Sequence, residues 1–419
     1  SPALRQSASP PPAKPRRAEG PPQLPPTLLA AIEGRSLQTV EVPVELEQPV
    51  PHITVSERSG IRSLNLMSTY ADIEGSQLRE GQVLVQMRAV PLSSADLNTK
   101  LHRPGDIFGA QGAGQVRLLG PNVTGLQLGD WVVPLLEVDE EGDLLEDAPP
   151  PGTARGLAVF AERRCARLAM APDVVLGPSQ LALAKSIGAA YYMIEEHTSR
   201  LQAGDAIILN CANGTVGQVL VQMLAILKYK VLAVVREHGE EEREHLDITR
   251  RRLEGLGAAK VIFDDDEMEA AVQEAGAGLP ELALDGVGGE STARLASCLS
   301  RSGDIVCYGN AGGSRKRSLP SGWGKKWKGA IVDFSFDEWL QQDLPKHSRR
   351  FQEMVAEAAK LIQARRLSIE IMEYSVNDFA QAVEEMRKPC RTHAVVLLFP
   401  RLTQAGEAAL VELPQQVAR

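Results

Sequence analysis

Several features that would assign this 419-residue chain to a specialised class are scarce or absent. No apolar run reaches the roughly 18 to 20 residues that cross a bilayer. A formal net charge of −9 argues against broad affinity for nucleic acid. The five cysteines are scattered and odd in number, which indicates reduced thiols in the core and a reducing compartment: Cys165, Cys211, Cys298, Cys307 and Cys390. Neither a membrane nor DNA is therefore the expected partner.

The bulk composition is that of an ordinary globular protein with an unusual beginning. With 43% hydrophobic and 24% charged residues, the chain can bury a substantial core, and its length predicts two folded units plus appendages. The first 26 residues contain nine prolines and no acid before Glu19, so they cannot form a helix or a core. A chain that opens on Ser1 with such a segment is expected to have had an organellar presequence removed.

The strongest local signal is a strand, a glycine turn and a helix over residues 205–237, DAIILNCANGTVGQVLVQMLAILKYKVLAVVRE. Residues 206–209 are a short apolar run, and apolar residues from Val219 onward recur at helical spacing. Gly214 and Gly217 permit a tight turn and a close approach of pyrophosphate to the N-terminus of a helix that begins near Val216. This motif predicts dinucleotide binding, although such a turn also serves as a purely structural corner.

Arg236 stands at the end of the second apolar strand, about 20 positions after the glycine turn. An acidic residue at this place binds the ribose hydroxyls of NAD, whereas an arginine pairs with the 2′-phosphate of NADP. The sequence therefore favours NADPH over NADH. A surface arginine that closes a strand is the alternative, and the acidic residues that follow it weaken the case for an anion site.

The order of predicted strands and helices divides the chain into parts. Short β-like runs with turn signals predict a β-rich domain before residue 171, and alternating strands and helices then predict a doubly wound parallel sheet. The expected strands of that sheet are residues 206–209, 231–235, 261–263, 282–284 and 305–308. We expect a helix over 351–365 and a strand over 394–399 that rejoins the first domain. The expected parts are a proline-rich arm (1–45), a β-rich domain (46–171), a Rossmann domain (172–343), a return segment (344–400) and a tail (401–419).

Five segments carry a resemblance to a known family. They are AVPLSSADLN from Ala89, GPNVTGLQLGDWVVP from Gly120, LQAGDAIILNCANGTVGQ from Leu201, LALDGVGG from Leu282 and SGDIVCYGN from Ser302. With them the chain resembles the medium-chain dehydrogenase/reductase superfamily, and most closely its mitochondrial 2-enoyl thioester reductases, over roughly residues 64–400. The resemblance implies an α/β fold with a GroES-like β-rich substrate domain, a Rossmann domain and a cleft between them.

The same resemblance implies a cofactor, partners and a location. NADPH is the expected cofactor, either still bound or lost, and the residues expected to hold it are Asn213, Gly214, Thr215, Val216, Gly217, Arg236, Tyr308 and Phe334. The substrate would be an enoyl thioester of mitochondrial fatty-acid synthesis, in the matrix. We expect a homodimer, or protein partners in a larger assembly bound through the arm and the tail.

Two departures from family patterns bear on the chemistry. Zinc-dependent relatives need a cysteine near position 95 and a His-Glu pair in the next glycine segment, but Ala95 and GAQGAG stand there, so no metal site is expected. The thioester reductases use a tyrosine shortly after the Asp-Asn segment, and TKLHRPGDIFGAQGAG contains none. His102 is the one candidate proton donor in that stretch, and a solvent-facing loop residue is the alternative interpretation.

Other positions also depart from the reductase pattern, and like the absent tyrosine they point to weakened catalysis. Ala154 replaces an expected tryptophan, Ser186 and Ile187 replace Asn-Pro, and Phe334 to Phe336 read FSF in place of Phe-Trp-Leu. Loss of one general acid costs about 10²- to 10⁴-fold in rate. We therefore expect weakened or lost catalysis in an accessory subunit of a mitochondrial assembly. The alternatives are an active NADPH-dependent reductase of trans-2-enoyl thioesters and a quinone oxidoreductase.

Overall fold

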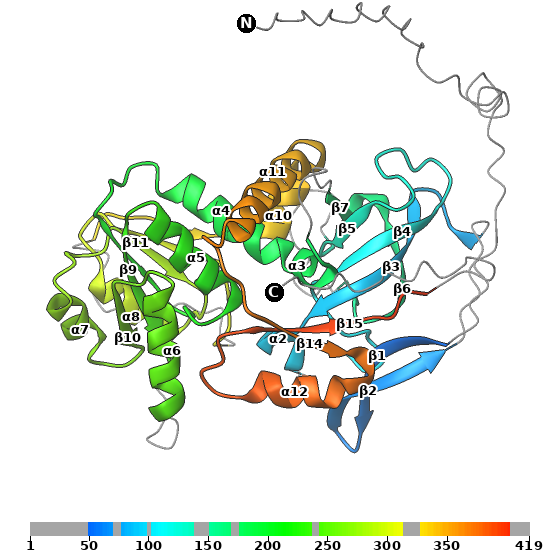
Figure 1. The fold of residues 1–419 in the computed structure, drawn as a ribbon, viewed down its shortest axis with the longest axis horizontal. Helices are drawn as coiled ribbons and strands as arrows, with labels where there is room; N and C mark the ends of the chain where they lie inside the picture. Colours follow the sequence, from blue (N-terminus) through cyan, green and yellow to red (C-terminus); the bar gives the residue numbers. More distant parts are fainter. Residues whose placement is uncertain are drawn as a thin grey trace, which may run out of the picture. The chain divides into compact units, whose positions relative to one another are not determined.

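The computed structural model describes residues 49–69, 77–98, 102–137, 151–168, 176–236, 243–312 and 327–402. All of them fall in one compact unit of the chain, Pro43–Arg419. The described strands form a six-stranded sheet, a seven-stranded sheet and a separate two-stranded hairpin (Figure 1). The fold is therefore a β-rich, GroES-like part joined to a Rossmann-like α/β part. The five segment boundaries expected from the sequence stay a prediction.

The six-stranded sheet is parallel throughout and has the order β10-β9-β8-β11-β12-β13. Chain order places β8 and β11 side by side at the centre, where the direction of winding reverses. Ligands of such sheets bind outside the carboxyl ends of the strands at this reversal. The strands are β8 (Ala206–Leu209), β9 (Lys230–Val235), β10 (Lys260–Phe263), β11 (Leu282–Asp285), β12 (Asp304–Cys307) and β13 (Ile331–Asp333).

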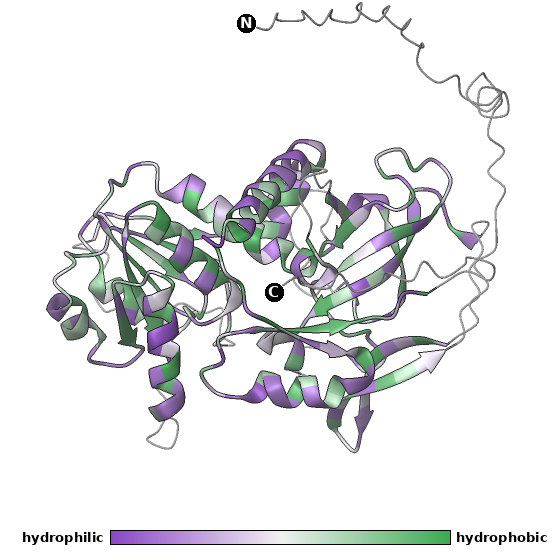
Figure 2. Cartoon of the chain, viewed as in Figure 1, coloured by the Kyte–Doolittle hydropathy of each residue, from purple (hydrophilic) through white to green (hydrophobic). Residues whose placement is uncertain are grey.

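Both faces of this sheet are covered, because successive side chains of a strand point to opposite faces. Ile207 and Leu209 of β8 pack with helices on one face, and Ala206 and Ile208 pack with helices on the other. Figure 2 shows these strands as mostly hydrophobic and the outward side of the surrounding helices as more hydrophilic. The first face carries α4 (Ala184–His197), α5 (Thr215–Ile226), α6 (Arg243–Gly255) and α11 (Leu344–Gln363); the second carries α7 (Met268–Glu274) and α8 (Glu290–Cys298).

The seven-stranded sheet has the order β14-β15-β3-β4-β5-β7, with β6 also paired to β3. The expected strand at 394–399 forms β15, which pairs antiparallel with β3 and so returns the end of the described chain to the β-rich part. The strands are β3 (Gln82–Pro91), β4 (Ala113–Leu119), β5 (Trp131–Pro134), β6 (Leu157–Ala161), β7 (Cys165–Leu168), β14 (Ile371–Ser375) and β15 (Ala394–Leu398); the hairpin is β1 (Val50–Arg58) with β2 (Ile61–Thr69).

Short helices connect these layers and have local causes in the sequence. In α10 (Phe336–Gln342) the Ser335 side chain accepts a hydrogen bond from Glu338 N, which caps the helix. Pro345 lies in the first turn of α11, where a missing N–H costs nothing. The other described α-helices are α2 (Ser94–Leu97), α3 (Pro178–Ala182) and α12 (Phe379–Arg387).

The described helices and the five cysteines can be compared with what the sequence led us to expect. None of the described helices combines the length and the apolar composition that crossing a membrane requires. All five cysteines are free thiols, but Cys165 and Cys298 alone are fully buried, so the expectation of core thiols holds for these two. Cys211, Cys307 and Cys390 are half-buried.

Candidate functional site

The turn between β8 and α5 has the geometry that the glycine motif predicts. Cys211 takes a left-handed conformation with φ of 51°, and its carbonyl accepts a hydrogen bond from Gly214 N at 3.0 Å. A Cβ on Gly217 would overlap that same carbonyl oxygen and lie 2.7 Å from Ala212 Cα. Gly217 is therefore required for packing α5 onto the turn. Helix α5 begins one residue earlier than expected, and no side chain caps its N-terminus at Gly214.

A buried polar network joins this turn to the neighbouring strand β11. Asn210 Nδ2 donates to Asp285 Oδ1 at 2.6 Å, and Asn210 Oδ1 accepts from Gly286 N at 2.7 Å. Asp285 Oδ1 also accepts from the backbone N–H groups of Val287 and Gly288, at 2.9 Å each. Because its partners come from both central strands, the network fixes the two loops at the reversal of the sheet.

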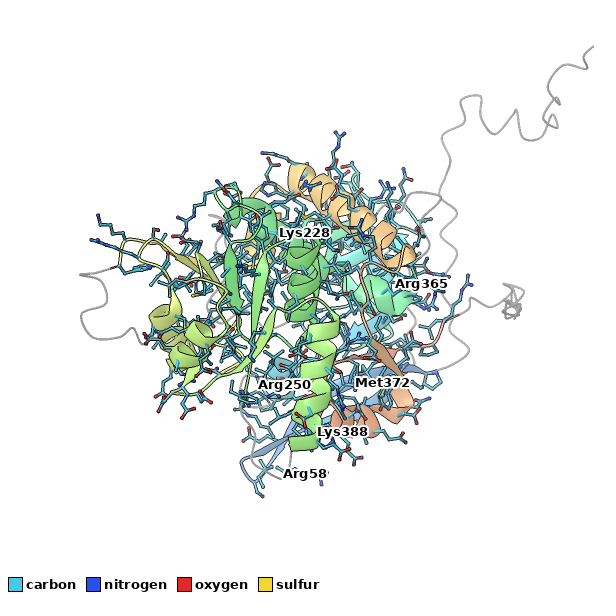
Figure 3. All side chains as sticks on the ribbon, turned by 60° about the vertical axis from the view of Figure 1, so that its left-hand side comes forward. Arg58, Lys228, Arg250, Arg365, Met372 and Lys388 are labelled. Carbon is cyan, nitrogen blue, oxygen red and sulfur yellow. The ribbon has the colours of Figure 1, made fainter. Side chains whose placement is uncertain are left out.

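A cavity of about 490 Å³ lies at the ends of β8 and β9, and we call it the arginine pocket. Arg236, which follows β9, lines it together with residues 387–391, which comprise the last residue of α12 and the segment that follows it. Figure 3 shows α6, marked by Arg250, and the chain at Lys388, and residues of both segments line this cavity. The cationic lining residues are Arg236, Arg387, Lys388 and Arg391, among Cys211, Asn213, Gly214, Asp264 and others.

The glycine turn itself holds Arg391 at this pocket. Asn213 Nδ2 donates to the carbonyl of Arg391 at 3.1 Å, and Gln218 Nε2 donates to the carbonyl of Thr392 at 2.8 Å. From α6, Thr249 Oγ1 donates to the carbonyl of Cys390 at 2.7 Å. Burial lowers the pKa of Arg391, while Glu385 and Cys211 act in the opposite direction. An anion in this pocket would relieve that unfavourable burial.

A second cavity, of about 580 Å³, lies at the carboxyl ends of β11, β12 and β13, and we call it the strand-end pocket. Its other walls are Gln111 from the β-rich part and the first turns of α4 and α5. The residues that line this cavity include Gln111, Lys185, Ser186, Val216, Asp285, Tyr308, Phe334, Asp337 and Glu338. The arginine pocket and the strand-end pocket thus flank the glycine turn.

Tyr308 carries a buried polar atom without a partner in the described part of the chain. Its hydroxyl lies close to Gly286, where an added Cβ would stand 2.7 Å from that oxygen. Burial raises the pKa of Tyr308 well above 10, and Cys211 and Asp285 reinforce the shift. The phenol therefore keeps its proton and is available to donate a hydrogen bond to a ligand at the glycine turn.

The structure brings most of the predicted cofactor residues together around the two pockets. Asn213, Gly214 and Arg236 line the arginine pocket. Val216, Tyr308 and Phe334 line the strand-end pocket. Thr215 and Gly217 line neither of these cavities and contribute the first turn of α5.

His102 is not where the alternative interpretation placed it. Its side chain is 4% exposed, so the solvent-facing loop position is wrong. The ring nitrogen Nε2 lies 2.9 Å from the backbone carbonyl oxygen of Asp96. The centroid of the His102 ring lies 6.2 Å from the centroid of the Phe108 ring. His102 lines neither of the two pockets, because these contacts hold it inside the β-rich part. It stays a candidate on sequence grounds alone.

The described residues contain no group of three or more His, Cys, Asp or Glu side chains arranged to hold a metal ion. Gln111 lies in the glycine segment where zinc-dependent relatives have a His-Glu pair. Its Oε1 accepts a hydrogen bond from the neutral Ser186 Oγ at 3.4 Å.

Comparison with known proteins assigns the class. The family model of the alcohol dehydrogenase GroES-like domain matches residues 79–169, and that of the zinc-binding dehydrogenases matches residues 256–392. The human mitochondrial enoyl-acyl-carrier-protein reductase is 30% identical over 334 residues, covering 76% of this chain and 81% of the relative. The chain therefore belongs to the medium-chain dehydrogenase/reductase superfamily. Within it, the chain is homologous to the mitochondrial enoyl-acyl-carrier-protein reductases.

Other relatives and solved structures agree with that placement. The enzyme of the same name from Dictyostelium discoideum is 26% identical over 364 residues, which are 83% of this chain and 96% of the relative. The mitochondrial 2-enoyl thioester reductase heterodimer Etr1p/Etr2p from Candida tropicalis is similar with a TM-score of 0.63 and 19% identity, covering 84% and 99%. A complex of Etr1p with NADP and crotonyl-CoA has a TM-score of 0.62 and 18% identity, with the same coverage. At these identities the structures support the fold.

Sequence reasoning missed two groups of lining residues. The basic residues 387–391 are about 150 positions from Arg236, and no local pattern links them to the glycine turn. Lys185 and Asp337 are also far apart in sequence, yet Lys185 Nζ lies 2.7 Å from Asp337 Oδ1 at the strand-end pocket. A basic run directly after an amphipathic helix was the one signal available for the first group.

Proposed function

We propose that this chain binds NADPH and reduces the carbon–carbon double bond of 2-enoyl thioesters. The observation that carries the proposal is the placement of Arg236 and Arg391 at one cavity beside the uncapped N-terminus of α5. Relatives named as mitochondrial enoyl-acyl-carrier-protein reductases, and a neighbour solved with NADP and crotonyl-CoA, support the choice of cofactor and substrate.

The residues present fit the cofactor at three points. Arg236 and Arg391 supply fixed positive charge for a ribose phosphate, and arginine forks match phosphate geometry. The free N–H groups of the first turn of α5 suit a pyrophosphate. The buried Tyr308 hydroxyl, which has no partner among the described residues, offers a donor between the glycine turn and Gly286. When bound, NADPH supplies a hydride for the reduction.

The chain's own side chains then have separate tasks. The network of Asn210 and Asp285 holds the two loops in place before any ligand arrives. Phe334 stacks on Tyr192, with ring centroids 5.0 Å apart and planes 10° from parallel, and gives the strand-end pocket a rigid apolar wall. Such a wall excludes water from the place where an acyl chain would lie.

A second candidate is an NADPH-binding protein with little or no turnover, which serves as an accessory subunit of a mitochondrial assembly. The observation that favours it is the combination of an absent tyrosine after the Asp-Asn segment with the fully buried Ala154 where a tryptophan is expected. Pairing of subunits in the Candida tropicalis heterodimer supports a partner chain or a second copy.

Product analysis separates these candidates. Purified protein is incubated with NADPH and crotonyl-CoA, and the reaction is followed by mass spectrometry for butyryl-CoA. Formation of butyryl-CoA is the expected result. Oxidation of NADPH by a quinone but not by crotonyl-CoA would instead assign quinone reduction. No oxidation with crotonyl-CoA, longer 2-enoyl thioesters or quinones would leave the accessory role.

A further inference from the structure

A reductase of enoyl thioesters needs a proton as well as a hydride, and the usual donor is missing here. His102, the candidate from the sequence, lines neither pocket. The Tyr308 phenol at the strand-end pocket has a pKa raised well above 10, because burial disfavours its anion. Asp285 is already engaged by its neighbours through several hydrogen bonds. Lys185 is the one cation among the described residues that line this pocket.

Lys185 is a buried cation that lines the strand-end pocket. The residue is 5% exposed, and Asp337, its counter-ion, is 8% exposed. Within the described part of the chain, the carboxylate of Asp337 is the sole acceptor for the ammonium group of Lys185, at 2.7 Å. An ammonium carries three N–H donors, so two remain for a ligand. A charged lysine is tolerated at this depth because the paired carboxylate compensates it.

The pair is held rigidly by three elements. Lys185 belongs to the first turn of α4, and Asp337 to the first turn of α10. Asp337 Oδ1 also accepts from Leu136 N at 3.1 Å, and Gln341 Nε2 donates to the carbonyl of Leu136 at 2.9 Å. The loop after β5 and helix α10 therefore fix the carboxylate, and the carboxylate fixes the ammonium. Such fixed geometry is what a proton donor requires.

We propose that Lys185 is the catalytic proton donor of this chain. NADPH, if bound, would supply a hydride to the β-carbon, and the electron pair of the carbon–carbon π bond would then be shared between the α-carbon and the thioester oxygen. An N–H bond of Lys185 then breaks and a C–H bond forms at the α-carbon. The neutral amine, hydrogen-bonded to Asp337, regains its proton from water. The step rests on the proposed function, because it takes the hydride acceptor to be an enoyl thioester.

The decisive variant is Lys185→Arg, which keeps a positive charge but cannot release a proton near neutral pH. NADPH affinity and melting temperature are expected to match the wild type, while turnover of crotonyl-CoA falls about 10²- to 10⁴-fold. Lys360→Arg is the matched control, because Lys360 is exposed on α11, and it should retain full turnover. An active wild type with an equally active Lys185→Arg variant overturns the assignment and leaves the proposed function intact. An inactive wild type overturns both.

A second variant covers the case in which arginine does not fit. Asp337→Asn keeps Lys185 and an oxygen to accept from Leu136 N, but it removes the charge that stabilises the ammonium. Without the paired carboxylate the buried ammonium loses its compensating charge, so the alkaline limb of the turnover profile should move toward acid. The carboxylates of Asp285, Asp333 and Glu338 also line the pocket and are unchanged. An alkaline limb that does not move overturns the role of Lys185.

A measurement without cofactor tests whether Lys185 reaches the acyl site. Crotonaldehyde and cyanoborohydride at pH 9 convert accessible lysines to secondary amines, which peptide mass spectrometry locates. Labelling of Lys185 that crotonyl-CoA prevents is expected, whereas labelling of the exposed Lys360 should be indifferent to crotonyl-CoA. Failure to label Lys185, or labelling that crotonyl-CoA does not reduce, contradicts direct contact with substrate.

Discussion

At the scale of single residues, the proposed specificity for NADPH would depend on arginines from two distant parts of the chain. Arg236 follows β9, and Arg391 follows α12. We expect Arg236→Ala to weaken NADPH binding about 10- to 100-fold, because a hydrogen bond to a charged group contributes about 1.5 to 3 kcal/mol. NADH, which lacks the 2′-phosphate, should bind equally to both proteins. Fluorescence titration with each nucleotide measures the difference.

The matched control is Arg58→Ala at the end of β1, because Arg58 is exposed and lines neither cavity. It should leave both affinities unchanged. If Arg236→Ala lowered the affinities for NADPH and NADH by the same factor, Arg236 would be a general anchor and not the reader of the 2′-phosphate.

One contribution to the pH dependence of stability comes from His393, which is close in sequence to Arg391 of the arginine pocket. Burial lowers the pKa of His393 below 6.5, Arg391 adds to the shift, and Glu385 and Glu370 oppose it. The unfolded chain therefore binds the proton more readily than the folded chain, so stability falls as pH drops below 6.5. Thermal melting from pH 7.5 to 5 should show a shallower acid loss for His393→Gln than for the wild type. Parallel curves would exclude a contribution from His393.

Some site residues could be predicted from sequence and others could not, for a physical reason. Gly214, Gly217 and Arg236 belong to one local strand-turn-helix unit, whose spacing is set by the geometry of the turn. Arg391 and Lys185 reach their pockets through tertiary contacts, with Asn213 and Asp337 respectively. A single sequence contains no record of such contacts.

At the scale of elements, the packing of α5 on its turn is the critical contact of the Rossmann part. Gly217→Ala places a methyl group against the carbonyl of Cys211 and 2.7 Å from Ala212 Cα, both backbone atoms that cannot move aside. We expect a loss of about 1 to 3 kcal/mol in the free energy of unfolding, typical of overpacking, together with weaker NADPH binding. Urea unfolding measures the first and fluorescence titration the second.

Gly255→Ala at the end of α6 is the control, because nothing lies within 4 Å of the added methyl group. It should be neutral or stabilising, since alanine favours the helix. Equal stability of the two variants would mean that α5 can shift on the turn and that the turn does not require glycine at position 217.

Five of the six strands of the Rossmann part were predicted to within a residue or two, and β13 was not predicted. The expected strands at 206–209, 231–235 and 282–284 correspond to β8, β9 and β11, because buried parallel strands are continuous apolar runs bounded by turns. Helix α11 begins at Leu344, seven residues before the expected start, since its first turns are polar and capped by Asp343. The strand over 394–399 was predicted to rejoin the first domain, but its partner in the sheet, β3, was not predicted.

At the scale of the whole molecule, every residue that lines the two pockets lies between Ser94 and Arg391, within the unit that begins at Pro43. A chain shortened to start at residue 43 should therefore bind NADPH with unchanged affinity. If the accessory role is correct, the same shortened chain should no longer co-purify with its assembly. Titration and affinity purification of the two forms give the two answers, and unaltered co-purification would remove the role assigned to the proline-rich arm.

In the proposed function, one chain joins a nucleotide site to a reducing site across the glycine turn. The most direct test is a fluorescence titration of the purified protein with NADPH, followed in the same cuvette by crotonyl-CoA. Saturable binding and then loss of NADPH absorbance on addition of the thioester is the predicted result. Absence of NADPH binding under conditions where the protein is folded would contradict the central claim.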